Sequence, residues 1–481
     1  FYIDKVQTFG AVPWYDTSID ATDQEALFKD RDNREFVASK ILEDLDYACT
    51  YCLTSDKYRV RASYIHRYVA LALKARFCLY EGTMRKYHAV DPSTGRAWTK
   101  DESRFYLGEC VKACEAIMGD GVYKLTDDPA KRQTQYRDMF TNADACGVYT
   151  DEFIWARDYD IDLKVTYAIN NYMVNPQHAN YAFTRQFIDT YLMTDGTPFT
   201  SKYPDYDDLD LVAECTDRDY RLAQTIRTPG FTRDGGTTQW APDVKFSKTG
   251  YQPIKWLTDD SSKDTNVAAI ASDVPLIRYA EVLLAYSEAK AELGEMSEEV
   301  WDKTIKPLRE RAGVDGTRPT KIDEYLQNAY YSTDDGNPKI TDCDILEIRR
   351  ERAVELIQEG FRLQDLYRWK AGYCIDQAIS GMYFPGPGEY KLAGKETADL
   401  ILYKAGETKP QAGEGVSVYE LGSDIILSEG NKGYVYYHKT VENQRPGFNE
   451  ERDYLYPIPS GERSLNPNLT QNPGWSDGLD F

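Results

Sequence analysis

The sequence predicts a mostly α-helical protein with a loop-rich middle and a few short β-strands, and three observations predict this class. Apolar residues recur at helical spacing over residues 1–119 and again over residues 275–370. Between these regions, residues 150–271 are rich in Asp, Gly, Pro, Thr and Tyr, and long periodic runs are few. After residue 383, short alternating runs between Gly and Pro turns are typical of small strands.

Helix signals dominate the N-terminal region. Residues 1–10 read as the end of a helix that a glycine stops, and residues 33–52 carry apolar side chains at every fourth position. A longer apolar-rich helix is predicted over 61–87, and a third over 105–118. These short antiparallel pairs are similar to helix-turn-helix repeats, although no strict repeat consensus is visible.

Helices return in the second half of the chain. A helix is predicted over 275–293, with Pro275 in its first turn and a glycine directly after its end. Residues 298–312 predict its partner, interrupted near Pro307. The strongest helix is predicted over 344–370, where Gly360 is expected to kink or end the first half.

The middle and the C-terminal region read differently. Two short helices are expected near 184–192 and 219–225 within long loops, and loops of this length are usually functional. Strands are expected at 400–403 and 434–438. Residues 454–475 are dense in Pro and Asn, so we expect an extended strap that packs on the helical scaffold.

Composition excludes nucleic acid as a partner and a membrane-spanning segment. The chain has 481 residues, and 57 basic against 79 acidic side chains give a formal net charge of −22. A surface this acidic repels phosphate backbones. No run approaches the ~18 uncharged apolar residues that a membrane helix needs.

Tyrosine is the one residue type that stands out. The chain has 38 Tyr against 17 Phe and 8 Trp. Tyrosine combines a flat apolar face with a polar tip, which suits surfaces that bind sugars or peptides. A Tyr-rich helical core is the alternative interpretation.

The motifs of common enzymes and metal sites are absent from the sequence. There is no HExxH, GxSxG or P-loop, and the four histidines lack ligand spacing. The nine cysteines are odd in number, and the two closely spaced pairs, 49 with 52 and 110 with 114, have no second pair to complete a zinc site. We therefore expect no catalytic residue, no cofactor and no metal.

Two acidic patterns need an interpretation. Asp158, Asp160 and Asp162 mimic the start of a calcium loop, but Leu163 stands where glycine is required, so only a non-standard calcium site is left open. The glutamates at 351, 355 and 359 lie four apart on the strongest helix. We interpret them as ion-pair partners of neighbouring segments and not as a catalytic pair.

The C-terminal run LYPIPSGERSLNPNLTQNPGW, residues 455–475, is similar to the C-terminal signature of the SusD/RagB family of nutrient-uptake outer-membrane lipoproteins. The run ERAVELIQEGFRLQDLYRW, residues 351–369, is similar to the family's helix E-R-x-x-E-L-x-x-E-G-x-R-x-x-D-L-x-R-W. Further matches in the family's order are VPLIRYAEVLLAYSEAKAELG (274–294), TDGTPF (194–199), DRDYRL (217–222) and KVQTFGAVPW (5–14).

The resemblance implies one SusD-like domain over 1–481. Its tetratricopeptide-like helix pairs would form a scaffold from about 1–119 and 275–370, with a ligand-binding half at 150–271 and small strands and extended chain at 383–481. In the family the fGxVP segment lies well inside the chain, after a lipidated cysteine. Here it opens the sequence, so we expect the anchor and the first helices to lie upstream.

The resemblance also implies a function. Family members are lipid-anchored at the cell surface, on the outer face of the outer membrane, and cap a SusC-like TonB-dependent transporter. They capture oligosaccharides, or peptides in some members, and they are not enzymes. A helical interaction scaffold without a small ligand is a third interpretation.

A sugar site needs flat rings to stack on and polar groups that bind hydroxyls. The family's ligand residues match no fixed motif, so the candidates come from composition and position alone. They are Trp98, Trp155, Arg157, Tyr159, Tyr167, Asn171, Tyr172, Tyr181, Trp240 and Trp256. For each one, a half-buried loop anchor is the alternative. Exposed rings in an arc would favour a glycan, and a deep groove would favour a peptide.

Overall fold

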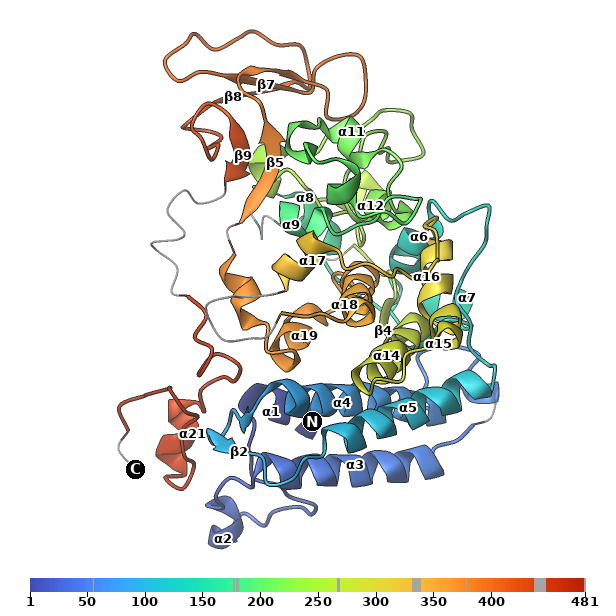
Figure 1. Ribbon diagram of the computed structural model, residues 1–481, viewed down its shortest axis with the longest axis vertical. Coiled ribbons are helices and arrows are strands. Elements are labelled where there is room, and N and C mark those ends of the chain that lie inside the picture. The colour runs from blue at the N-terminus through green and yellow to red at the C-terminus, as the bar shows by residue number, and fades with distance from the viewer. Residues whose placement is uncertain are drawn as a thin grey trace.

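Three long helices lie side by side at one end of the molecule, shown at the bottom of Figure 1. They are α3 (Arg34–Tyr51), α4 (Arg67–Tyr87) and α5 (Ser103–Gly119), and α1 (Tyr2–Phe9) packs on α3. The computed structural model describes all residues except 55, 176–177, 179–180, 266–268, 331–338, 378, 437–446 and 480–481.

Caps and a close approach explain why these helices form and pair. The side chain of Asn33 accepts a hydrogen bond from the N–H of Phe36 at 2.7 Å and so caps α3. Gly10 ends α1 with φ +74°, a conformation that glycine adopts without strain. At Gly82 a Cβ atom would lie 2.7 Å from Leu107 Cγ, so glycine lets α4 approach α5 closely. The predicted N-terminal helices are confirmed, except that α4 begins six residues later than expected.

A second helical layer covers the first. Its central helix α14 (Tyr279–Glu292) contacts α4, α5 and α18 (Cys343–Glu355). The remaining helices of this layer are α15 (Glu298–Lys303), α16 (Ile305–Arg311), α17 (Glu324–Ala329) and α19 (Arg362–Arg368). The largest apolar core lies between α1, α3, α4, α5 and α14.

The loop-rich half holds short helices and small sheets. Its helices are α6 (Gln135–Thr141), α7 (Ala145–Val148), α8 (Ile169–Val174), α9 (Arg185–Ile188), α10 (Phe199–Lys202), α11 (Leu211–Cys215), α12 (Tyr220–Thr225) and α13 (Val244–Ser247). Helix α2 (Gln24–Leu27) lies near the N-terminus, and α21 (Ser460–Leu465) lies near the C-terminus. The two short helices predicted in the middle are confirmed as α9 and α12.

Every described strand belongs to a small sheet. Antiparallel pairs form between β1 (Val90–Asp91) and β2 (Arg96–Ala97), between β3 (Phe153–Arg157) and β4 (Val274–Arg278), and between β5 (Ser380–Phe384) and β9 (Gly433–Tyr436). A three-stranded sheet joins β6 (Gly388–Tyr390), β7 (Leu400–Tyr403) and β8 (Ser417–Glu420), with β7 and β8 parallel. This sheet lies at the end of the molecule opposite α3 (Figure 1). The mostly helical class with few short strands is confirmed, as is the strand at 400–403. The strand expected at 434–438 is found as β9, and residues 437 and 438 lie outside the described residues.

Two predicted helices have different boundaries in the structure. Residues 274–278 form strand β4 and not the first helical turn, because they pair with β3, a segment that lies far away in sequence. The N–H of Tyr279, where α14 begins, donates to the carbonyl of Glu152 at 2.8 Å. The interruption near Pro307 falls at Thr304, since proline at position 307 has no N–H to bond to the carbonyl of Lys303.

One further prediction is confirmed and another needs correction. The helix expected over 344–370 is interrupted around Gly360 as expected: α18 and α19 are joined by a turn in which Gln358 and Gly360 have φ +59° and +88°. The strap at 454–475 is not wholly extended, because Pro459 directly precedes α21 and its carbonyl accepts from Arg463 N–H. The strap does pack on the scaffold: Tyr456 N–H donates to the Thr8 carbonyl at 2.8 Å.

A buried ion network joins the loop-rich half to the scaffold. Glu355 on α18 accepts from Arg221 of α12, Arg278 of β4 and Arg311 of α16, at 2.9, 2.9 and 2.6 Å. These arginines hold the pKa of the Glu355 carboxyl well below its usual range, against the opposing effect of burial. Glu351 and Glu359 are paired in the same way, with Arg309 and Lys255 among their partners. The interpretation of these glutamates as ion-pair partners is confirmed.

Within the described part of the chain, no helix has both the length and the apolar character needed to cross a bilayer.

Candidate functional site

Three of the predicted ligand residues lie together at the end of strand β3 and in the loop that follows it. The Arg157 guanidinium lies 4.9 Å from the centre of the Tyr159 ring, and the Tyr159 and Tyr167 rings are 4.6 Å apart. A side chain from a distant segment holds the loop in place: Asp273 accepts a hydrogen bond from the N–H of Tyr159 at 2.8 Å. Tyr167 donates to the Ser272 carbonyl at 3.0 Å, and burial raises the pKa of its hydroxyl. Arg157 is exposed and both rings are half-buried.

Two tryptophans from distant segments line one cleft of about 380 Å³. Trp155 comes from β3 and is half-buried, whereas Trp256 is only 8% exposed. The Trp256 ring meets Phe140 edge to face at 4.9 Å, inside a small apolar core. Trp256 therefore serves chiefly as a core residue, and Trp155 presents part of its ring to the cleft.

The other candidates do not converge. Asn171 is buried and donates to the Asp264 carbonyl at 2.7 Å. Tyr172 and Tyr181 are each 43% exposed, and the Tyr172 ring lies 5.0 Å from His178. These two tyrosines can reach a ligand, whereas Asn171 holds its loop.

Trp98 and Trp240 occupy separate places. Trp98 donates its indole N–H to the His88 carbonyl at 2.7 Å and lies 5.2 Å from the Arg85 guanidinium. Trp240 lies within 6 Å of two arginines and lines a different pocket of about 340 Å³. The ten candidates thus form one cluster, one shared cleft and several isolated positions.

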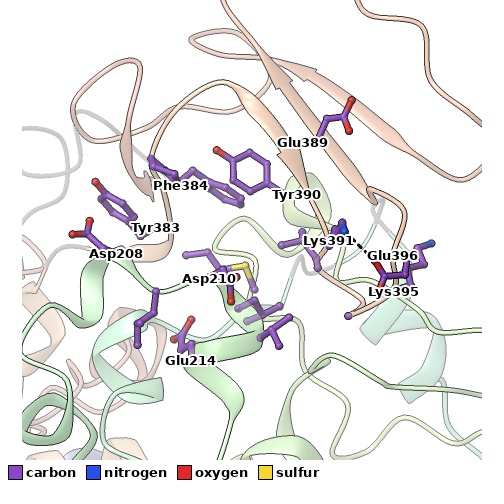
Figure 2. A pocket seen from close by; sticks show the side chains of 17 residues that line it. Asp208, Asp210, Glu214, Tyr383, Phe384, Glu389, Tyr390, Lys391, Lys395 and Glu396 are labelled. Atoms are coloured by element: carbon purple, nitrogen blue, oxygen red, sulfur yellow. Dashed lines mark hydrogen bonds and ion pairs between the residues drawn. The ribbon is translucent and has the colours of Figure 1, made fainter.

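A further pocket, which the sequence did not indicate, lies where α11 faces strands β5 and β6. Its volume is about 430 Å³. Figure 2 shows the rings of Tyr383, Phe384 and Tyr390 on one side of the hollow, with Asp210 and Glu214 on the other. Asp208 lies beside the Tyr383 ring. Two carboxylates thus face the rings across the pocket.

Local structure holds the three rings in place. Phe384 is buried and meets the Tyr390 ring edge to face at 4.7 Å. The Tyr390 hydroxyl donates to the Gly386 carbonyl at 2.5 Å, and Tyr383 packs on Tyr434 at 5.6 Å. Tyr383 and Tyr390 are half-buried, so each ring keeps a free surface towards the hollow.

The carboxylates of the pocket differ in whether other groups of the protein already bind them. Asp210 caps α11 by accepting from the N–H of Ala213 at 2.8 Å, and the buried Glu214 accepts from the Tyr251 hydroxyl at 2.8 Å. Asp208 and Glu389 are exposed, and within the described residues neither forms an ion pair or a side-chain hydrogen bond. The run MYFPGPGEY, with three rings around a Gly-Pro turn, was the available signal for this pocket.

One group of possible metal ligands occurs among the described residues. Ligand atoms of Cys146, Asp158 and Asp273 lie within 4.8 Å of one another. Asp158 accepts from Arg61 Nε at 2.9 Å, and Asp273 accepts from the backbone N–H groups of Cys146 and Tyr159. Burial raises the pKa of the Cys146 thiol, which keeps it protonated. The two carboxylates thus stabilise the loop after β3.

The sequence is similar to one family of known proteins. A model of the SusD family matches residues 151–475. A SusD-like protein of Formosa agariphila is 24% identical over 399 residues, which cover 79% of this chain and 66% of that protein. The chain therefore spans slightly less than two thirds of the length of this curated relative.

Solved structures show the same fold. A SusD-like carbohydrate-binding protein of Bacteroides fragilis superposes with a TM-score of 0.65 at 20% identity, covering 98% of this chain and 77% of that one. A second SusD-like protein of Bacteroides fragilis gives a TM-score of 0.63 at 20% identity with the same coverage. The helical scaffold and its loop-rich half are thus shared with these proteins.

Proposed function

The chain belongs to the SusD family, and from this premise we propose that it captures oligosaccharides at the cell surface and delivers them to a SusC-like TonB-dependent transporter in the outer membrane. A lipid anchor would hold the whole protein to that membrane. The chain binds its glycan without hydrolysing it. One of the structural relatives is described as carbohydrate-binding, which supports the proposal.

The observation that carries the proposal is the pocket in Figure 2. Two half-buried tyrosine rings and several carboxylate groups line a hollow of about 430 Å³. The C–H face of a sugar ring stacks on an aromatic ring, and sugar hydroxyls donate to carboxylates. The exposed surfaces of Arg157, Tyr159 and Tyr172 offer a second contact region for a longer glycan.

Affinity should be weak to moderate. A protein that passes its ligand to a transporter must release it, so tight binding would stall import. We expect a Kd on the order of 1 μM to 1 mM, or about −8 to −4 kcal/mol.

Affinity electrophoresis against a panel of polysaccharides tests the proposal. The double variant Tyr383→Ala/Tyr390→Ala should lose most of the retardation, because it removes both half-buried rings on which a sugar can stack. Tyr64→Ala is the control, since Tyr64 is 48% exposed and does not line the pocket. It should migrate as the wild type does.

A second variant separates the two contact regions. If Trp155→Ala/Tyr159→Ala/Tyr172→Ala abolishes binding and the pocket variant does not, the segment from β3 to α8 is the site. If no polysaccharide retards the wild type and a peptide library binds instead, peptide capture replaces the proposal.

The transporter partnership has its own test. When the full-length protein is extracted from outer membranes in a gentle detergent and purified, a β-barrel protein should co-purify with it. Repeated recovery of the protein without any barrel would count against the partnership.

A further inference from the structure

Negative charge exceeds positive charge in the pocket of Figure 2. Five carboxylates and two lysines line it. The carboxylates belong to Asp208, Asp210, Glu214, Glu389 and Glu396. Asp210 and Glu214 lie across the hollow from the rings, and Asp208 lies beside Tyr383 (Figure 2). Glu389 lies at the rim on β6, with its carboxylate directed away from the rings.

The lysines are already paired within the chain. Lys391 Nζ lies 3.4 Å from Glu396, and Lys395 Nζ lies 2.6 Å from Asp399. Lys432, which Asp208 influences electrostatically, pairs with Glu429 at 3.3 Å. An anionic ligand would have to break one of these pairs to gain a cation.

Asp208 and Glu389 are available to a ligand. Both side chains are exposed, and neither is engaged by another described side chain through an ion pair or a hydrogen bond. An ionised carboxylate only accepts hydrogen bonds. It therefore binds a hydroxyl or ammonium group and repels a carboxylate or sulfate group.

We propose that this pocket takes oligosaccharides without acidic groups and that its carboxylates exclude glycans carrying uronate or sulfate. The inference rests on the proposed function, because it concerns the same pocket. Two features act in the same direction. The faces of the tyrosine rings carry partial negative charge. The net charge of −22 also repels polyanions before they reach the pocket, and added salt shortens the range of this repulsion.

A glycan array with neutral, uronate-bearing and sulfated probes tests the inference on the intact chain. The wild type should retain neutral probes and bind acidic ones at least tenfold more weakly. The variant Asp208→Lys/Glu389→Lys should bind acidic probes at least tenfold better than the wild type, with a larger gain at low salt.

The matched control is Asp44→Lys/Asp101→Lys. It makes the same change in net charge at exposed positions on α3 and before α5, at the other end of the molecule (Figure 1). An equal gain in the control would assign the effect to net charge and overturn the inference.

Two other outcomes separate the inference from the proposed function. If the wild type retains an acidic glycan and Tyr383→Ala releases it, the charge inference fails and glycan capture stands. If the wild type retains no glycan of any class, the proposed function fails and the inference fails with it.

Discussion

Asp189 is a buried carboxyl group whose ionisation the fold opposes. Burial, the main cause, raises its pKa to about 7, although the Arg185 Nε atom lies 3.5 Å from Oδ2. The same oxygen accepts from the Tyr325 hydroxyl at 3.2 Å, and Oδ1 has no hydrogen-bond partner in the described part of the protein. The folded state therefore binds a proton more tightly than the unfolded chain does.

This shift predicts a pH dependence of stability. Between about pH 4 and pH 7 the folded protein holds a proton that the unfolded chain has released, so the free energy of unfolding falls as pH rises. Asp189→Asn cannot ionise and should gain stability relative to the wild type over that range. Urea unfolding at pH 5, 6, 7 and 8 measures the difference. A constant difference at all four pH values would contradict the assignment, and the exposed Asp44→Asn serves as control.

Glu355 is the residue on which the buried ion network depends most. Glu355→Gln leaves Arg221, Arg278 and Arg311 without the carboxylate that they share. Removing one partner of a buried pair costs about 3–5 kcal/mol, so the urea midpoint should fall strongly. Glu299→Gln, which removes an exposed partner of Lys303, should leave the midpoint unchanged. Equal midpoints for the two variants would show that the network contributes little.

At the scale of elements, the turn between α18 and α19 sets the direction of the second helix. Gly360 has φ +88°, and no atom lies within 4 Å of the position that a Cβ would take. Gly360→Ala should therefore be destabilised by backbone strain alone, by about 1–2 kcal/mol. Gly108→Ala is the matched test, because Gly108 lies within α5 with equally open space.

The two alanine variants should shift stability in opposite directions. Alanine within a helix is favoured over glycine by about 0.8–1.0 kcal/mol, so Gly108→Ala should raise the melting temperature. Thermal unfolding followed by circular dichroism measures both. A rise for Gly360→Ala would mean that the turn relaxes to another conformation.

At the scale of the whole molecule, Arg31 joins the two ends of the chain. Its guanidinium donates to the carbonyls of Phe9 and Ala11 near the N-terminus, at 2.9 and 2.8 Å. It also donates to the carbonyl of Thr470 in the C-terminal strap, at 3.0 Å, and to the Asn472 side chain at 2.6 Å. The N-terminal segment and the strap are thus held together across more than 400 residues of sequence.

Arg31→Ala should loosen the strap. Hydrogen bonds to charged groups contribute about 1.5–3 kcal/mol, and several are lost together here. Limited proteolysis should then cut within 455–475 before the helical scaffold is attacked. Arg96→Ala, at an exposed position on β2, is the control and should resist as the wild type does. Cleavage at the same rate in both variants would contradict the role of Arg31.

The sequence predicted the long helices well because their apolar residues recur with the helical period. It missed β4, since Val274–Arg278 also fits a helical start and its pairing with β3 is not visible in local pattern. It missed α21 because the density of Pro and Asn outweighed the short helical turn after Pro459. These errors arise where distant pairing or one well-placed proline decides the structure.

The candidate site was less predictable than the fold. Position in the loop-rich half singles out a stretch of candidates around Tyr159, but it could not separate Asn171, which holds its loop, from the exposed Tyr172. The pocket of Figure 2 joins residues 208–214 to residues 382–396. Only the folded chain brings these segments together, so the three rings at 383–390 give a sequence signal for one wall of the pocket and none for the other.

Hydrogen–deuterium exchange with a saturating glycan tests the central claim most directly, because it reports both binding and its location. We expect slower exchange in residues 206–214 and 382–392, with α3 unchanged. The Tyr383→Ala/Tyr390→Ala variant should lose this protection at the same glycan concentration. Protection confined to other segments, or none at all with any glycan tested, would contradict the claim that this pocket captures an oligosaccharide.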